Sequence, residues 1–285
     1  MRRVRPAEIF DGTTMVVVPH MDDCTLACGG TIALLADRSL VHMVYATDGR
    51  RAPAPEVPWL DTVPEDLRPA REAEARAAME RIGLPRENVH FLGLPDGRLR
   101  RHRMDLREAL ARLFERLAPD RLLIPFRYDR HPDHLAVNDV VTSPRDGLGF
   151  ERTILEYFVY HRWRLLPLGD IRRYLPSDAL LEVDIREAAG TKQAALELFH
   201  SQTTRYFAWQ SRPNLTRELI EAVSSEPETF FLYDPALRGA HVLDGPRAWI
   251  RVAHRLEPFL KKHKDRVVAL TRRAFRGATP RQPEQ

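Results

Sequence analysis

The sequence predicts an α/β fold in which a mostly parallel sheet is covered by helices on both faces. Two observations carry this expectation. Short apolar runs rich in β-branched residues alternate four times with segments whose apolar residues recur at helical spacing. In addition, acidic residues and histidines gather just past the ends of the apolar runs, where open α/β sheets place their sites.

The alternation defines the elements in turn. The first strand, TTMVVVP (13–19), precedes a helix that opens on two aspartates and extends over 22–38. The Pro-rich segment 52–69 predicts a surface loop, and the next helix ends at Gly83, a residue suited to a helix C-terminus. Further strands are predicted over 40–49, 88–94, 121–126, 154–161 and 180–185, and further helices over 72–83, over 103–118, from Pro132 onward and over 187–200.

Length and composition are those of a globular chain with a sizeable core: 285 residues, 44% of them hydrophobic. The N-terminus has no apolar run long enough for a signal peptide, and no stretch approaches the roughly 18 apolar residues of a membrane span. We therefore expect a cytoplasmic protein. The two cysteines, Cys24 and Cys28, lie four residues apart and match neither a disulfide framework nor a common zinc spacing.

Basic charge is concentrated in the tail. Residues 247–281 hold eleven Lys and Arg against two acidic residues, a net +9, so the rest of the chain carries −5. The basicity therefore does not indicate that the main domain binds nucleic acid, and no such partner is expected. We expect a domain over 1–245 and a basic, partly amphipathic extension over 246–285. The apolar stripe of the extension either packs on the domain or contacts an anionic surface, and it consists of Trp249, Val252, Leu256, Phe259 and Leu260, with a break at Pro258.

Four polar segments follow the first four predicted strands: PHMDD, TDG, LPDG and RYDRHPDH. Because parallel strands end at one edge of a sheet, these segments predict a single functional site. His20 and Asp23 are three residues apart at a strand-to-helix turn, so both can point at one centre. His131 and His134 have the same spacing at a helix start. Two His with one Asp make a reasonable catalytic zinc set with an open position for water, and Asp22 is then free to act as a base.

The segment PHMDDCTLACGG, together with DRHPDH, resembles the signature of the LmbE/PIG-L family of zinc-dependent N-acetylglucosamine deacetylases. That signature is (P/A)HPDDE near the N-terminus and HPDH roughly a hundred residues later. The likeness extends to ATDG, REAEARAAMERIG and LGLPDG, so it covers roughly residues 13–200. It implies a Rossmann-like three-layer fold with the active site at the carboxyl ends of the strands, in agreement with the alternation.

The resemblance also implies roles for individual residues. Zn²⁺, or another divalent metal such as Fe²⁺, would be bound by His20, Asp23 and His134. Asp22 would be the general base that activates the metal-bound water, and it would return the proton to the leaving amine.

Further residues are implied around this centre. His131 would stabilise the tetrahedral oxyanion, unless it only caps the helix that it opens, and Asp133 would orient an imidazole. A weaker likeness places Arg71 and Asp96 at the sugar, although a solvated helix charge and a turn residue are equally open interpretations. Further candidate substrate contacts at the same edge are Asp48 and Asp129.

Two positions depart from the family pattern, which has Pro where this chain has Met21 and Glu where it has Cys24. Neither position supplies a metal ligand in the family. We expect altered packing at Cys24 and a shifted substrate range rather than loss of activity. Cys28 is most simply a buried small residue. Two thiol alternatives remain: a zinc thiolate at Cys24, which would close the open position, and a cysteine nucleophile, which zinc chemistry does not need.

The most consistent hypothesis is a metal-dependent amide hydrolase that acts on a linear C–N bond and removes an N-acetyl group from an N-acetylglucosamine-type sugar or glycoconjugate. One alternative is an altered family member with another N-acyl substrate. A second is a Rossmann-type cofactor binder, which is disfavoured because no GxGxxG follows the first strand. A third is a peripheral binding protein that uses its basic tail on a membrane or on nucleic acid.

Overall fold

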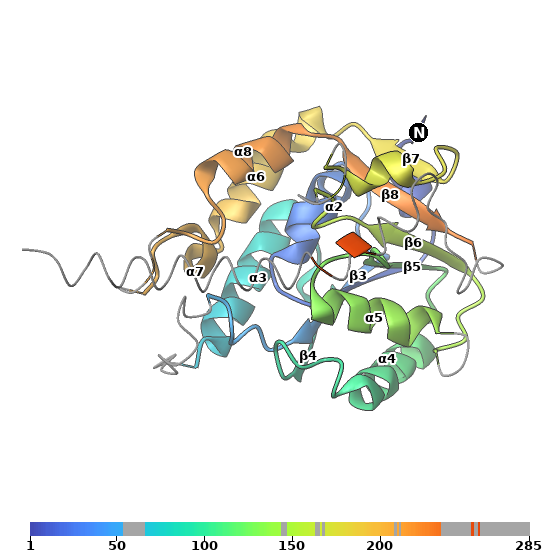
Figure 1. The fold of residues 1–285 in the computed structure, drawn as a ribbon, viewed down its shortest axis with the longest axis horizontal. Coiled ribbons are helices and arrows are strands. Elements are labelled where there is room, and N and C mark those ends of the chain that lie inside the picture. Colours follow the sequence, from blue (N-terminus) through green and yellow to red (C-terminus); the bar gives the residue numbers. More distant parts are fainter. Residues whose placement is uncertain are drawn as a thin grey trace, which may run out of the picture.

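The computed structural model describes residues 1–53, 66–143, 147–162, 169–207 and 212–234, together with positions 166, 210, 252, 253 and 256. Within them a single eight-stranded sheet has the strand order β1-β7-β8-β6-β5-β2-β3-β4 (Figure 1). β8 is antiparallel to its neighbours β6 and β7, and every other pair is parallel. The predicted α/β fold with a mostly parallel sheet is therefore confirmed.

The sheet consists of β1 (Arg2–Arg3), β2 (Thr14–Val18), β3 (Val41–Thr47), β4 (Val89–Leu94), β5 (Arg121–Pro125), β6 (Thr153–Tyr157), β7 (Leu180–Val183) and β8 (Glu228–Tyr233). The α-helices are α1 (Pro6–Ile9), α2 (Asp23–Ala33), α3 (Arg68–Ile82), α4 (Arg103–Leu117), α5 (Pro132–Thr142), α6 (Ala189–Glu197), α7 (His200–Thr203) and α8 (Arg217–Ser225). Three short 3₁₀ turns complete the list: η1 (Arg86–Asn88), η2 (Ile171–Tyr174) and η3 (Arg186–Ala188).

Helices cover both faces of the central strands. On one face, Val16 and Val18 of β2 pack in a cluster with apolar residues of α2, α3 and α6. On the other face, Met15 and Val17 of the same strand pack with residues of α4 and α5. All five residues of β2 are buried, because a strand covered on both faces has no polar side to offer to water. Figure 1 shows α4 and α5 on the opposite side of the sheet from α2, α3 and α6.

The chain reverses its direction of travel across the sheet at β2. From β2 it moves outward through β3 and β4, and it then returns to pair β5 on the other side of β2. The loops after β2 and β5 therefore leave adjacent strands toward opposite faces, which is the place where open α/β sheets bind their ligands. This topology brings residues 19–23 and 126–134 together, although more than a hundred positions separate them in the sequence.

Several predicted element boundaries were wrong. The predicted loop 52–69 overlaps α3, which begins at Arg68 because Pro69 suits a first helical turn. The predicted helix over 187–200 is interrupted: η3, α6 and α7 are separate elements, and α6 ends at Glu197. The first helix ends at Ala33 rather than near 38. The helix end at Gly83 is confirmed, with φ 90° at that residue.

A buried ion pair fastens α2 and α6 to β8. Glu228 accepts hydrogen bonds from the backbone N–H groups of Gly30 (2.8 Å) and Thr31 (2.7 Å). Lys192 Nζ donates to Glu228 Oε1 (2.7 Å) and to the carbonyl of Leu26 (2.8 Å). Lys192 and Glu228 are 1% and 4% exposed, so each charge depends on the other for its compensation.

Removing one partner of this pair should destabilise the fold strongly. We expect Lys192→Met to lower the free energy of unfolding by about 3–5 kcal/mol, because Glu228 is left buried without its cation. Urea unfolding followed by circular dichroism measures the loss. Arg186→Met, which breaks the exposed pair with Asp184, is the matched control and should leave the midpoint of urea unfolding nearly unchanged. Adding Glu228→Gln to Lys192→Met should recover part of the loss, and strictly additive effects would contradict the coupling.

No helix in the described ranges is both long and apolar enough to cross a membrane. The predicted extension over 246–285 lies outside these ranges except at positions 252, 253 and 256. Of these, Ala253 is buried against the cluster that contains Phe126 and Phe158, whereas Val252 and Leu256 are exposed. The proposed domain boundary at 245 stays a prediction.

Candidate functional site

Three loops at the carboxyl edge of the sheet deliver the candidate site. The loop after β2 carries His20 and leads into α2 at Asp23, and the loop after β5 carries Asp129 and leads into α5. The loop after β4 carries Asp96. The predicted clustering at this edge is therefore confirmed, since His20 contacts residues from all three loops.

One atom from each of His20, Asp23 and His134 forms a corner of a small triangle. His20 Nδ1 lies 3.1 Å from Asp23 Oδ2, His134 Nε2 lies 3.2 Å from the same oxygen, and the two nitrogens are 3.4 Å apart. Neighbouring ligands of a tetrahedral metal bound at about 2.0–2.2 Å are separated by about 3.3–3.5 Å. The triangle thus has nearly the spacing that a single small cation requires, and the donor set of two imidazoles and a carboxylate suits it.

The opposite nitrogen of each histidine faces a carboxylate. His20 Nε2 is 3.3 Å from Asp96 Oδ1 and 3.4 Å from Asp133 Oδ2. His134 Nδ1 is 3.2 Å from Asp129 Oδ2. These contacts are ion pairs, and the His134 Nδ1 atom makes no hydrogen bond in the structure. A carboxylate behind a ring favours the proton on the nearer nitrogen, which leaves the other nitrogen available as a metal ligand. This arrangement is the usual outer support of histidine ligands.

Electrostatics in the site favour positive charge at its centre. Burial by itself lowers the pKa of His134, but Asp129 and Asp23 outweigh it and raise the pKa to about 9. Burial likewise opposes the charged form of His20, yet Asp23, Asp133 and Asp96 hold its pKa well above the ordinary value. The pKa of Asp23 is held well below its usual range, since the two histidines overcome the effect of burial. Without a metal the site thus takes up protons, and a divalent cation can replace them.

His131 is the N-cap residue of α5, which confirms that it caps the helix that it opens. Its predicted contact with the oxyanion stays a prediction. Its Nδ1 accepts the backbone N–H of Asp133 at 3.3 Å, and its ring lies edge-on to His20 with the centroids 4.6 Å apart. Burial and the two neighbouring histidines lower the pKa of His131 to about 3. The ring is therefore neutral near pH 7, and with Nδ1 used as an acceptor it carries its proton on Nε2.

A nitrogen of His131 also lies within 4.8 Å of ring nitrogens of His20 and His134, so a three-histidine set is a second possible metal arrangement.

Asp133 links the site to the loop after β4. Its two carboxylate oxygens accept the backbone N–H groups of Gly97 (2.7 Å) and Leu99 (3.0 Å), while Oδ2 also faces His20 Nε2. The imidazole that it contacts is that of His20, which comes from the other half of the sheet. Asp133 is 1% exposed, so it is placed to support a ligand from behind and is shielded from water.

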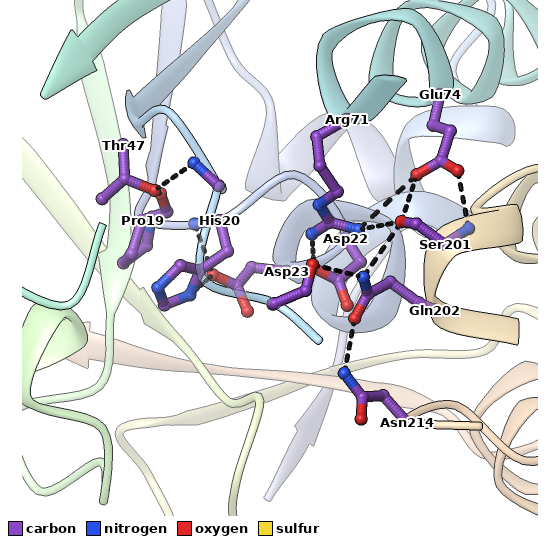
Figure 2. Close-up of polar contacts among 12 residues, drawn as sticks. Pro19, His20, Asp22, Asp23, Thr47, Arg71, Glu74, Ser201, Gln202 and Asn214 are labelled. Atoms are coloured by element: carbon purple, nitrogen blue, oxygen red, sulfur yellow. Dashed lines mark hydrogen bonds and ion pairs between the residues drawn. The ribbon is translucent and has the colours of Figure 1, made fainter. Parts of the chain in front are cut away.

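Asp22 pairs with Arg71 and not with the histidines. Arg71 Nη2 donates to Asp22 Oδ1 at 2.8 Å, and the arginine is fully buried, whereas 15% of the Asp22 side chain is exposed (Figure 2). The doublet of Asp22 and Asp23 is thereby divided, with one carboxylate on the histidines and the other on a guanidinium.

The remaining predicted substrate residues lie at the same edge, and most are already engaged. Asp96 accepts the backbone N–H of Arg51 at 2.8 Å besides facing His20, and it is 5% exposed. Asp48 is buried and pairs with Arg50 at 2.7 Å, and its other oxygen accepts backbone N–H groups. Asp129 accepts the backbone N–H of His131 and stands behind His134. A direct contact of any of them with substrate stays a prediction.

Sequence reasoning missed four residues around the site. Glu74, Ser201 and Gln202 surround the Arg71 guanidinium, and the ring of Tyr160 lies 5.6 Å from that of His134. Helical spacing offered a signal for Glu74, since it follows Arg71 by three positions on the same helix. The other three come from segments with no motif, and only the fold brings them here.

The cysteines lie in the apolar interior. Cys24 and Cys28 are fully buried in the cluster formed by α2 and the central strands, and their sulfur atoms are 3.7 Å apart as free thiols. The hydrogen bond with the neighbouring Cys24 thiol, together with burial, raises the pKa of Cys28 well above the ordinary value. Within the described residues, the groups that could hold a metal are made of His and Asp alone.

Replacing Cys24 should therefore leave metal binding intact. We expect the zinc content of Cys24→Ala to equal that of the unaltered protein, with a modest loss of stability from the small cavity. Metal content by inductively coupled plasma mass spectrometry checks this expectation, with Cys28→Ala as the matched control. A loss of zinc confined to Cys24→Ala would restore the thiolate alternative.

Comparisons with known proteins agree with this architecture. The structure is similar to N,N'-diacetylchitobiose deacetylase from Pyrococcus horikoshii in complex with its inhibitor MPG, with a TM-score of 0.57 and 18% identity over 85% of this chain and 91% of that chain. The zinc-inhibited form of teicoplanin deacetylase Orf2 gives 0.54 and 15% over 77% and 97%. GalB, the 4-carboxy-2-hydroxymuconate hydratase from Pseudomonas putida KT2440, gives 0.50 and 18% over 82% and 97%. Among curated proteins no significant match to the sequence was found.

Fold and site together define an α/β protein with a buried His/Asp centre at the point where the strand order reverses. Residues 15–144 match the family model described as PIG-L: GlcNAc-PI de-N-acetylase. The chain thus carries a domain of the PIG-L (LmbE-like) family over these residues, as its two motifs predicted. That span contains every residue of the His/Asp centre, whereas Tyr160, Ser201 and Gln202 lie beyond it.

Proposed function

We propose that this protein is a metal-dependent amide hydrolase that removes the N-acetyl group from an amino sugar or its glycoconjugate, releasing acetate and a free amine. The observation that carries the proposal is the convergence of His20 Nδ1, Asp23 Oδ2 and His134 Nε2 within 3.4 Å of one another. The family domain over 15–144 gives that centre its chemical context. Family resemblance also supports an amino sugar as the amine that carries the acetyl group.

His20, Asp23 and His134 would hold the metal, for which we propose Zn²⁺, with Fe²⁺ as the second candidate. When bound, such a metal supplies Lewis acidity, which polarises an amide carbonyl and makes an attacking water easier to deprotonate. Asp96, Asp133 and Asp129 keep the two imidazoles in the tautomers that this role needs. They are nearly fully buried, which excludes water from the back of each ring.

We assign the proton transfer to Asp22. It is partly exposed and lies next to Asp23 in the chain, so as a carboxylate it could accept a proton from the water that attacks the acyl carbon. A new C–O bond forms in this step and the carbonyl electrons move onto oxygen. Asp22 then donates the same proton to the amide nitrogen as the C–N bond breaks. No covalent bond to the protein is formed. The products are acetic acid and the amine, and the acid proton then passes to the amine or to solvent, which leaves acetate.

His131 would steady the oxyanion between these two steps. Because its Nδ1 accepts the Asp133 N–H and its pKa is lowered to about 3, the neutral ring offers Nε2–H as a donor at any physiological pH. A neutral donor stabilises developing negative charge without competing with Asp22 for the proton. The N-cap contact fixes the ring, so little reorganisation is needed.

Three substitutions separate these roles. Asp22→Asn should retain zinc and lose turnover by about 10²–10⁴-fold, because the general base is gone. His131→Ala should also retain zinc and lose turnover, whereas His134→Ala should lose the metal itself. Metal analysis and amine release from a panel of N-acetylated sugars and glycoconjugates give both readouts. Loss of zinc from His131→Ala with zinc retained by Asp23→Ala would favour the three-histidine set instead.

Metal binding should expel protons. At pH 7.5 the raised pKa values keep His134 and His20 protonated in the metal-free protein, and both must be neutral to bind a metal, so about two protons should leave per Zn²⁺. Isothermal titration calorimetry in buffers of different ionisation enthalpy counts them. The number should fall as the pH rises past about 9, where His134 loses its proton unaided. Heats that are independent of the buffer at pH 7.5 would contradict this account.

The same panel separates the remaining alternatives. An altered family member would release another acyl group, which is detected as a carboxylate other than acetate. A binding protein that uses the basic tail would show salt-dependent association with anionic vesicles or RNA and no released amine from any substrate. The neighbouring hydratase shows that this fold is not confined to one reaction, so amine release from a defined substrate is the deciding measurement.

A further inference from the structure

Arg71 is enclosed by a polar network that the proposed reaction does not yet use. On one side its guanidinium binds Asp22, and on the other Nη1 lies 3.4 Å from Ser201 Oγ and 3.7 Å from Glu74 Oε2. Ser201 in turn donates to Glu74 through both Oγ and its backbone N–H, each at 2.7 Å. Figure 2 shows Asp22, Arg71, Ser201 and Glu74 in a continuous line from α2 to α3 and α7.

From this geometry we infer that Glu74 and Ser201 are positioning residues, which fix the orientation of Asp22 through Arg71. The inference rests on the proposed function of Asp22 as a base. Glu74 and Ser201 touch neither the His/Asp triangle nor Asp22 itself in the described contacts. Their influence must therefore pass through the guanidinium.

The network matters because Arg71 can hold Asp22 in place only if Arg71 is itself held. The arginine is fully buried and contacts Asp22 Oδ1 at 2.8 Å. Glu74 places a second carboxylate near Nη1 of the same guanidinium, and Ser201 bridges the gap between them. Arg71 is therefore held on two sides, and Asp22 has a partner in a fixed position.

The network is anchored from outside the family domain. Gln202 Nε2 donates to Ser201 Oγ (3.0 Å) and to the carbonyl of Ala52 (3.0 Å), and its Oε1 accepts from Asn214 Nδ2 (2.8 Å). The guanidinium also lies over the ring of Phe199, 5.8 Å from the centroid. Ser201 and Gln202 are nearly fully buried. Phe199 and Ser201 thus contact Arg71 directly, and Gln202 and Asn214 hold Ser201 in place.

The test compares Glu74→Ala and the isosteric Glu74→Gln with Ser201→Ala in the full-length, zinc-loaded protein. Without Glu74, Arg71 should no longer be held in place and Asp22 should lose its orientation, so we expect kcat to fall at least tenfold in Glu74→Ala while KM stays within twofold and zinc content is unchanged. Glu74→Gln keeps an acceptor for Ser201 and should lose less. Glu72→Gln, which removes a carboxylate from the exposed pair with Arg68 on the same helix, is the matched control and should change neither parameter.

Crystal structures of the zinc-loaded variants give a readout that does not depend on turnover. In Glu74→Ala and Ser201→Ala, Arg71 should reorient and Asp22 should shift with it, while His20, Asp23 and His134 stay in place. Asp22 and Arg71 unmoved in both variants would overturn the inference, as would a rise in KM with kcat unchanged. Should the unaltered protein release no amine from any substrate, the proposed function fails, and the crystallographic comparison still decides whether Glu74 and Ser201 position Asp22.

Discussion

Three atoms, His20 Nδ1, Asp23 Oδ2 and His134 Nε2, form a triangle with edges of 3.1–3.4 Å. Asp23 and His134 are almost inaccessible to water. Such a concentration of polar groups is costly unless each group is hydrogen-bonded or compensated. Compensation comes from a ring of aspartates behind the histidines, and these aspartates are in turn satisfied by backbone N–H groups of the loops. The loops at this edge are therefore shaped by the charges that they must stabilise.

The topology makes that convergence possible. The two ligand-bearing loops leave β2 and β5, which are neighbours only because the strand order reverses between them. α2 carries Asp23 at its first turn, and its later turn is fixed by Glu228 of β8 and Lys192 of α6. Gly30 permits the close approach of α2 to Ile185, since a Cβ atom there would lie 2.7 Å from that side chain. The position of the Asp23 carboxylate thus depends on packing that lies far from the site.

Local patterns predicted β2 to β7, the helix at Pro132 and the gathering of polar residues at one sheet edge, because apolar periodicity and Pro and Gly preferences act over a few residues. The pairing of PHMDD with HPDH further identified which residues converge. Contacts set by tertiary packing could not be predicted: helical spacing places Glu74 near Arg71, but nothing in the sequence shows that Ser201 joins them. β8 and the Lys192–Glu228 pair were missed for the same reason, since each depends on partners distant in the chain.

Cys24 shows how the site tolerates a departure from its family's pattern. The structure places this side chain in the apolar cluster beside Cys28, away from the groups that could hold a metal. A carboxylate in that position would need polar partners in an apolar interior, whereas a thiol needs none. The motif can therefore lose its glutamate while the triangle of His20, Asp23 and His134 persists, because the support of that triangle comes from Asp96, Asp129 and Asp133 on other loops. The first turn of α2 contributes Asp23 to the triangle, and the other segments at the sheet edge contribute the aspartates that face the two histidines.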